Sequence, residues 1–320
     1  MGTFIGHVLP GAGFMLIGLW HLFNTIKNYA QSPWDFQTTP WFPAKFRGNL
    51  FKYTELLAIL AGSFLSICAE LFIGPQKHQP LAEDWSIPPE HLNNFEHSSI
   101  SLFFLIYAAV ALYVDVRRVH VPHGFVHVIA ALAFSQELLL FHLHSADHMG
   151  AEGQYHWLLQ LVVLVSLFST ILEVPFPNSF IAAMVRSMSI LMQGIWFIHM
   201  GFMLWIPAFI PKGCEMHPEH GHVVVRCGDQ GANMRAKALA NLQFNWYMAA
   251  LVIFTTILYV KMVRRYGGEK LISYTAVDGD DIEMGNGAVK NSSPAQHRRS
   301  LDGSQSSMDT DSMQPLNLER

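Results

Sequence analysis

The chain has 320 residues, of which 51% are hydrophobic and only 14% are charged, and its mean hydropathy is +0.25. Soluble domains contain about 25% charged residues, so this composition excludes an ordinary soluble domain and indicates a membrane protein. The formal net charge is −4, and residues 267–320, with nine acidic and five basic residues, account for all of it. The remaining body is neutral, which excludes a nucleic-acid-binding charge pattern.

Seven apolar segments are long enough to cross a membrane as helices, because about 20 residues span the hydrocarbon core. The predicted helices are residues 6–25, 53–73, 98–115, 125–143, 156–174, 182–206 and 242–261. The first has neither a basic leader nor a small-residue cleavage site, so we expect it to be retained. The predicted fold class is therefore all-α: a polytopic membrane protein whose seven-transmembrane-helix bundle occupies residues 1–266.

Basic residues in the connections predict the orientation of the bundle. One side has Lys27, Lys45, Arg47, Lys52, Arg117, Arg118, Lys261, Arg264 and Arg265, and the other has only Lys77, Lys212, Arg226, Arg235 and Lys237. Because cytosolic connections carry the excess of basic residues, we expect a luminal or extracellular N-terminus and a cytosolic C-terminus.

Residues 267–320 are rich in Ser, Asp, Gly and Asn, so we expect a disordered cytosolic tail. Within it, YTAV at Tyr274 fits a tyrosine-based signal read by sorting adaptors, and HRRSLD places Ser300 after two arginines, which suits a basophilic kinase. An unstructured tail that no partner reads is the alternative.

Ionisable residues within the predicted helices fall into two layers, and each is costly in lipid unless it has a partner. In the cytosolic layer, Arg186 is the one buried cation that we identify, and Glu55 or Glu173 is expected to neutralise it. An interhelical ion pair explains this layer without any catalysis.

The second layer lies toward the predicted outer surface. Its central members are His142, His144, His156, Glu70 and His97, with His7, Glu137 and His199 at similar predicted depth. Neutral imidazoles with carboxylates suit a divalent metal such as zinc, and histidines also relay protons near neutral pH. A hydrogen-bonded structural cap is the third interpretation, and all three stay open.

Two cysteines, Cys214 and Cys227, flank the stretch CEMHPEHGHVVVRC in the predicted outer loop 207–240, and a disulfide between them is expected. A zinc site that includes His217, His220 and His222 is the alternative.

Two haems held by paired histidines are a further alternative, since His7 and His142 would face each other at one depth and His21 and His127 at another. We expect haem not to be bound, because His127 falls at a helix start together with His120 and His123, where solvated histidines are ordinary.

Several stretches resemble the transmembrane protein 45 family of animals and plants, which carries a domain of unknown function. They are GHVLPGAGFMLIGLW (6–20), YTELLAILAGSFLSICAELF (53–72), FEHSSISLFF (95–104), the segment 142–156 and LEVPFPNSFIAAMVRSMSILMQGIWFIHMGFML (172–204). The resemblance implies seven helices, a Golgi or other endomembrane location and recurring polar positions, at His7, Glu55, Glu70, His97, His142, His144, His156, Glu173, Arg186 and Gln193. His21 and His199 depart from that pattern. No reaction is implied.

Three functions remain open from the sequence. The first is an ion-binding or ion-handling membrane protein of the endomembrane system or plasma membrane, which would not be an enzyme. The second is a metal-dependent intramembrane lipid hydrolase, for which Ser98 beside His97 is the candidate nucleophile. The third is a membrane scaffold or trafficking protein controlled through its tail.

Overall fold

The computed structural model describes residues 3–44, 51–75, 78–145, 149–219 and 222–267. Its elements are α1 (Phe4–Gln31), α2 (Thr54–Cys68) with the π-helical turn η2 (Ala69–Ile73), the short 3-10 helix η3 (Pro89–His91), α3 (Leu92–Arg117), α4 (Phe125–Ser145), α5 (Gly150–Leu172), α6 (Phe180–Trp205), the 3-10 turn η4 (Pro207–Phe209), β1 (Cys214–Glu219), β2 (His222–Cys227) and α7 (Gln230–Tyr266). Within the described ranges, seven helices are long and apolar enough to cross a membrane, which confirms the predicted fold class.

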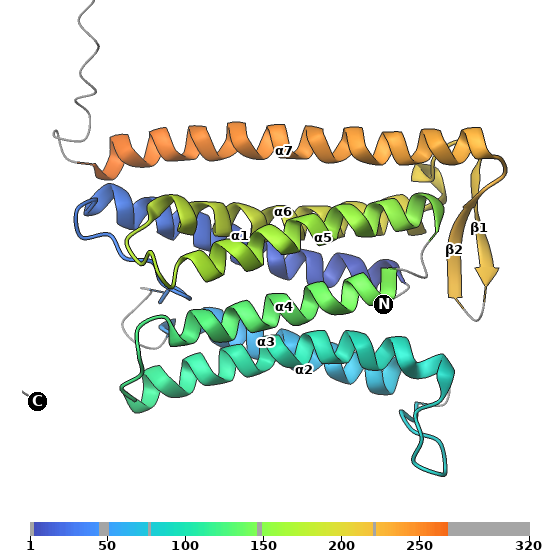
Figure 1. Cartoon of the computed structure of the whole chain (residues 1–320), viewed down its shortest axis with the longest axis horizontal. Coiled ribbons are helices and arrows are strands. Elements are labelled where there is room, and N and C mark those ends of the chain that lie inside the picture. Colours follow the sequence, from blue (N-terminus) through green and yellow to red (C-terminus); the bar gives the residue numbers. More distant parts are fainter. Residues whose placement is uncertain (1–2, 45–50, 76–77, 146–148, 220–221, 268–320) are drawn as a thin grey trace, which may run out of the picture. The chain divides into compact units, whose positions relative to one another are not determined.

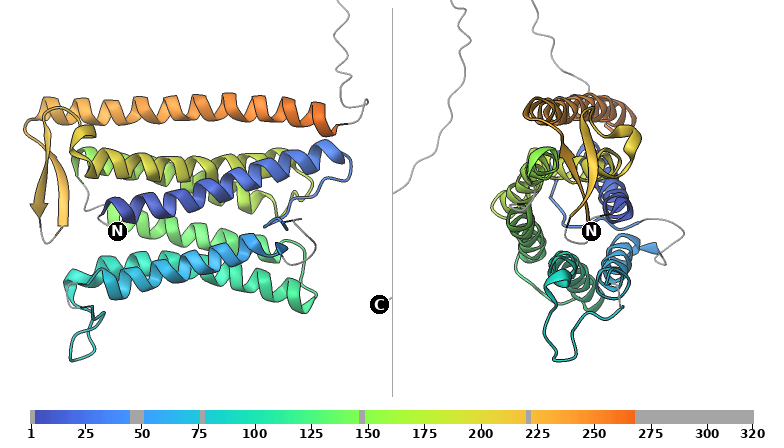
Figure 2. Two further views of the ribbon diagram at one scale, coloured as in Figure 1. Left: turned by 180° about the vertical axis from the view of Figure 1, so that it is seen from behind. Right: turned by 90° about the vertical axis from the view of Figure 1, so that its right-hand side faces the viewer.

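The helices lie side by side along one axis and alternate in direction (Figure 1). α6 packs against α1, α5 and α7, while α4 lies between α5 and α3, and α2 packs on α3, as the end-on view of Figure 2 also shows. We call the end that carries the β1–β2 hairpin the hairpin end, and the end where α1 and α6 meet the connection 32–44 the far end.

Apolar side chains are distributed as a lipid-facing bundle requires. Large hydrophobic residues are exposed along α2 and α7, including Phe64, Leu65, Trp246 and Ile253. The main apolar core lies instead among α1, α3, α4, α5, α6 and α7. The polar side chains within the bundle are therefore enclosed by an apolar shell.

Close packing of α1 against α6 depends on glycine. A Cβ added to Gly18 would collide with the backbone of Leu191, and one added to Gly194 would collide with the backbone of Met15. A Cβ on Gly11 would lie 2.9 Å from the backbone nitrogen of Ile198. Small residues let transmembrane helices approach closely, and here they bring the polar residues of α1 within reach of those on α6.

Helix α7 begins at Gln230, whereas the apolar pattern predicted a start at residue 242. The Asp229 side chain accepts a hydrogen bond from the Ala232 backbone N–H and caps the helix. Its first turns carry Arg235 and Lys237 and follow the hairpin, so they lie beyond the apolar run. Hydropathy detects only the part of a helix suited to lipid, which explains the late predicted start.

The hairpin at the start of α7 is a two-stranded antiparallel sheet in which Cys214 pairs with Cys227. A disulfide joins these two cysteines. Its sulfur atoms are therefore bonded to each other, which leaves the histidines alone as ligands in the alternative zinc site; of these, His217 is exposed. The predicted tail signals at Tyr274 and Ser300 lie outside the described residues.

Candidate functional site

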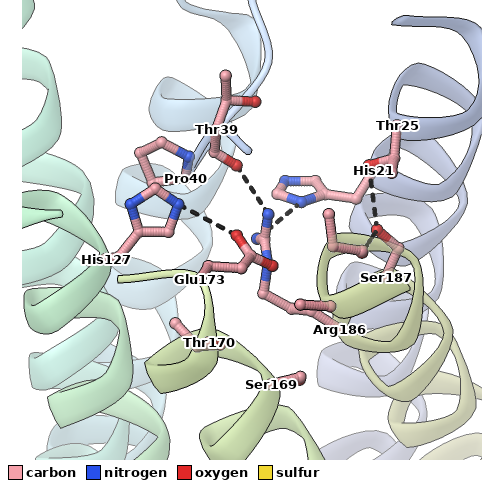
Figure 3. A network of polar contacts seen from close by, with 12 residues as sticks. His21, Thr25, Thr39, Pro40, His127, Ser169, Thr170, Glu173, Arg186 and Ser187 are labelled. Carbon is pink, nitrogen blue, oxygen red and sulfur yellow. Dashed lines mark hydrogen bonds and ion pairs between the residues drawn. The ribbon is translucent and has the colours of Figure 1, made fainter. Parts of the chain in front are cut away.

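The most extensive polar network lies at the far end and is centred on Arg186 of α6 (Figure 3). The guanidinium Nε of Arg186 donates to Oε1 of Glu173 at 2.6 Å, and both side chains are almost completely buried. Nη2 of Arg186 donates to the Thr39 backbone oxygen at 2.7 Å. A buried ion pair stabilises a fold only when its remaining donors and acceptors are also satisfied, and Thr39 meets part of that requirement.

The structure brings Glu55, the other carboxylate expected near Arg186, into the network through His21. Nη1 of Arg186 lies 3.1 Å from Nδ1 of His21, and Nε2 of His21 lies 2.7 Å from Oε1 of Glu55. Because a guanidinium only donates, His21 Nδ1 accepts, and Nε2 therefore donates to Glu55. The contacts thus specify one neutral tautomer of His21.

His127 is the fourth ionisable partner, and its position corrects the expectation of a solvated histidine. It is buried, with Nε2 3.1 Å from Oε2 of Glu173. Two carboxylates and one guanidinium leave this group one negative charge in excess when both histidines are neutral. Nδ1 of His21 is already occupied by Arg186, so His127 is the histidine of this group that lies beside Glu173.

The connection between α1 and α2 covers this network with backbone groups. The Phe42 N–H donates to Oε2 of Glu55 at 2.8 Å, and the hydroxyl of Tyr107 donates to the Pro40 oxygen at 2.6 Å. Phe36, Thr38 and Phe42 are buried. The sequence does not predict this role of the connection, because backbone donors and acceptors leave no residue-specific signal.

Two further polar pairs lie between the far end and the hairpin end. Oγ of Ser166 on α5 donates to Oγ of Ser189 on α6 at 2.9 Å. Nε2 of Gln193, midway along α6, donates to Oε1 of Glu137 on α4 at 2.5 Å. Both Glu137 and Gln193 are completely buried. Glu137 was expected at the outer boundary, but its pairing with Gln193 places it deeper in the bundle.

At the hairpin end, α2 and α3 provide a carboxylate with two partners. Oε2 of Glu70 lies 3.7 Å from Nδ1 of His97 and accepts a hydrogen bond from Nδ2 of Asn94 at 2.9 Å. Glu70 belongs to the π-helical turn η2. Such turns are frequent at functional sites, and this one carries the carboxylate directly beside α3.

Other predicted members of the outer layer form two more contacts. The His156 ring lies 5.9 Å from the His7 ring, centroid to centroid. His156 Nδ1 lies 2.9 Å from the backbone oxygen of Glu152. His142 Nδ1 lies 3.3 Å from Oε1 of Gln160. The side chain of His144 lies outside the described residues.

The predicted metal-site residues that the structure describes therefore lie in separate pairs and not in one cluster. Across the described ranges, no three His, Cys, Asp or Glu side chains are arranged to hold a metal ion. That observation does not include His144, so metal binding stays a prediction. The candidate nucleophile Ser98 is buried, and its Oγ donates to the Asn94 oxygen at 2.8 Å, so its hydroxyl proton is directed to its own helix.

A polar cluster between α5, α6 and α7 was not recognised as a unit from the sequence. Gln243 Oε1 accepts from the Tyr155 hydroxyl at 2.8 Å and lies 3.1 Å from His199 Nε2. The Tyr247 hydroxyl lies 3.3 Å from His199 Nδ1. The available signal in the sequence was Gln243, a glutamine next to the start of the apolar run 242–261. This cluster joins α7 to the bundle.

Comparisons with known proteins agree with the membrane fold. Residues 123–260 match the model of a family of unknown function (DUF716). The chain is also similar to Transmembrane epididymal protein 1A of Mus musculus, with 24% identity over 214 residues, covering 65% of this chain and 68% of that protein.

Fold and comparisons together define the class: this is a multi-pass integral membrane protein. Its similarity extends to an uncharacterised family whose matched segment contains α4, α5, α6 and most of α7, and therefore the residues Glu137, Glu173, Arg186 and Gln193.

Proposed function

We propose that this membrane protein handles protons through the polar interior of its helix bundle. The main support for this proposal is a series of buried side-chain pairs along one face of α6. Arg186, Ser189 and Gln193 occur at successive turns and contact Glu173, Ser166 and Glu137 in turn.

The residue types suit protons better than a larger solute. Ionisable residues inside a membrane bundle are expensive and often mark proton relays. A proton can move between hydrogen-bonded groups, so the relay needs no wide channel. Histidine is the residue type that commonly relays protons, and histidines lie at both ends of the bundle: His127 and His21 at the far end, and His142 and His156 at the hairpin end.

The test uses the purified full-length chain in liposomes that enclose a pH-sensitive dye. A potassium gradient with a potassium ionophore sets the voltage, and the internal pH is followed over time. We expect faster acidification than in protein-free liposomes. His127→Gln should abolish the added flux, because the amide keeps a polar group beside Glu173 but cannot carry the proton.

His123→Gln is the matched control, since His123 lies at the same end of α4 but is exposed. It should leave the flux unchanged. Equal acidification in liposomes with and without the wild-type protein would exclude the proposed function, and so would full flux in His127→Gln.

A divalent cation at the hairpin end is the second candidate function. Glu70 lies against the buried His97, and a second pair of buried imidazoles, His7 and His156, lies at the same end. Carboxylate and imidazole are ligands that zinc accepts. Retention of zinc by the purified protein would support this candidate.

The remaining assignments are proposals about placement in the cell. We propose a transmembrane domain of residues 1–266 and a cytosolic tail of residues 267–320, with a luminal or extracellular N-terminus. Membership of the transmembrane protein 45 family and a Golgi, other endomembrane or plasma-membrane location follow from the sequence resemblance. Sorting adaptors at Tyr274 and a kinase at Ser300 are the proposed tail partners.

A further inference from the structure

Among the buried carboxylates Glu55, Glu137 and Glu173, Glu137 alone has no arginine or histidine within ion-pair distance in the described ranges. Glu173 is bound by Arg186, and Glu55 accepts from His21 and from a backbone N–H. The ion pairs between described residues do not include Glu137. Its carboxyl receives one hydrogen bond, from the Gln193 amide.

The buried and half-buried His, Arg, Asp and Glu side chains on the elements around Glu137 contact other residues. On α3, His97 contacts Glu70, and Asp115 contacts Lys52 and Tyr53. On α5 and α6 the engaged groups are Tyr155, His156, Glu173, Arg186 and His199. On α4 itself, His127 contacts Glu173 and His142 contacts Gln160. A negative charge on Glu137 would therefore lack a counter-ion among these groups.

Two oxygen atoms of the Glu137–Gln193 pair indicate where a bound proton would form a hydrogen bond. Oε2 of Glu137 and Oε1 of Gln193 are buried and have no hydrogen-bond partner among the described residues. An ionised carboxylate would leave both oxygens as acceptors without a donor. A proton on Oε2 supplies a donor for Oε1 of Gln193, while the Gln193 amide already donates to Oε1 of Glu137. A carboxylic acid and an amide can pair in this way through two hydrogen bonds in a closed ring.

Energetics favour the same arrangement. Burying an unpaired carboxylate is costly even after the surroundings relax, and a buried acceptor without a donor adds a further cost. Protonation removes the charge and satisfies the acceptor of Gln193 in one step. Similar physics keeps carboxylic acids neutral in apolar enzyme sites.

We propose that Glu137 and Gln193 form a proton-binding site in the bundle interior, in which Glu137 holds a proton at neutral pH. This inference names the central proton-binding residue of the function proposed above and rests on that function for its biological meaning. The ligand is the proton, and the site lies between the two terminal groups of histidines.

Infrared spectroscopy of the full-length protein in lipid is the deciding experiment. A protonated carboxylic acid has a C=O stretching band that is separate from the carboxylate bands. We expect such a band in the wild-type protein at pH 7 and its complete loss in Glu137→Gln. Glu90→Gln, at an exposed position in the connection before α3, should leave the band unchanged.

An apolar carbodiimide supplies a chemical readout. Its nitrogen takes the acid proton while a carboxyl oxygen bonds to its central carbon, and the acyl group then moves to nitrogen to give a stable N-acylurea. No electron is gained or lost. Peptide mass spectrometry should find the adduct on Glu137 and not on Glu173, which is equally buried but ion-paired.

Misfolding of Glu137→Gln could also remove the acid band, so a second variant is needed. Gln193→Leu keeps the Glu137 carboxyl and removes only its hydrogen-bond partner. In that variant the acid band should persist and shift in frequency. Absence of a Glu137-dependent acid band from the wild-type protein would overturn the inference, whatever the liposomes show. A Glu137-dependent band without proton flux would uphold the proton-binding site and remove the proposed transport function.

Discussion

At the scale of single residues, Arg186 holds together the charged network of the far end. It contacts Glu173, His21 and the Thr39 backbone, and Glu55 is reached only through His21. The sequence predicted a glutamate partner but left two candidates open. Glu173 contacts Arg186 directly and Glu55 does not, and this difference can be tested.

Arg186→Met should lower stability by about 3–5 kcal/mol, because it leaves the Glu173 carboxylate buried without its cation. Adding Glu173→Gln should restore part of the loss, since the pair is then absent rather than broken. Thermal unfolding of the purified variants in one detergent measures both effects. Adding Glu55→Gln instead should restore less, because His21 and the Phe42 N–H already satisfy Glu55. Equal recovery from either glutamate would contradict the direct pairing with Glu173.

A second residue-scale prediction concerns metal. If zinc binds at the hairpin end, the purified wild-type protein should retain it through dialysis, and changing both His142 and His144 to Ala should reduce the bound zinc. Elemental analysis measures the ratio of zinc to protein. His120→Ala together with His123→Ala is the matched control at exposed positions of the far end. Equal zinc in all three samples would indicate non-specific binding, and its absence from the wild-type protein would favour the structural cap.

At the scale of elements, the contact between α1 and α6 decides whether the network can form, since His21 belongs to one helix and Arg186 to the other. The glycines allow this approach by removing side-chain volume. They do so selectively, because a Cβ added to Gly13 on the same helix would meet nothing within 4 Å.

Gly18→Ala should destabilise the protein by about 1–3 kcal/mol, because the new methyl group would overlap the backbone of Leu191. Gly13→Ala should be neutral or slightly stabilising, since alanine favours a helix more than glycine does. Thermal unfolding compares the two substitutions within one helix. Equal effects at both positions would show that helix propensity, rather than the contact with α6, determines the result.

At the scale of the whole molecule, the alternating helices place the hairpin and the connection between α2 and α3 on one side of the membrane. The disulfide between Cys214 and Cys227 suits an oxidising compartment. This agrees with the orientation predicted from the basic residues, in which the hairpin end is luminal or extracellular.

Asp84→Asn tests that orientation, because it creates the glycosylation sequence Asn-Trp-Ser at residues 84–86 in an exposed connection. In animal or plant cells we expect a gel shift that an endoglycosidase removes. The natural sequon Asn291-Ser292-Ser293 should remain unmodified, since it is predicted to be cytosolic. Glycan on Asn291 would reverse the predicted topology and the assignment of the hairpin end to the outer side.

The sequence by itself determined the class and the seven helices, because long apolar runs suffice to identify membrane spans. It also identified Arg186, Glu173 and Glu55 as residues that need partners, since a buried charge is costly in any arrangement. It could not find the Thr39 oxygen or the Phe42 N–H, because every residue type carries such backbone groups. Nor could it distinguish the buried His127 from the exposed His123.

Tertiary structure decided which polar residues meet. Glu137 and Gln193 are 56 residues apart in the chain, and they pair because α4 and α6 bring them to the same depth. His7 and His156 are neighbours, whereas His142 contacts Gln160. Periodicity specifies the face of a helix on which a residue lies, but it does not specify the neighbouring helix, its axial position or the space between them. Those depend on how all the helices pack together, including the glycines that let α1 reach α6.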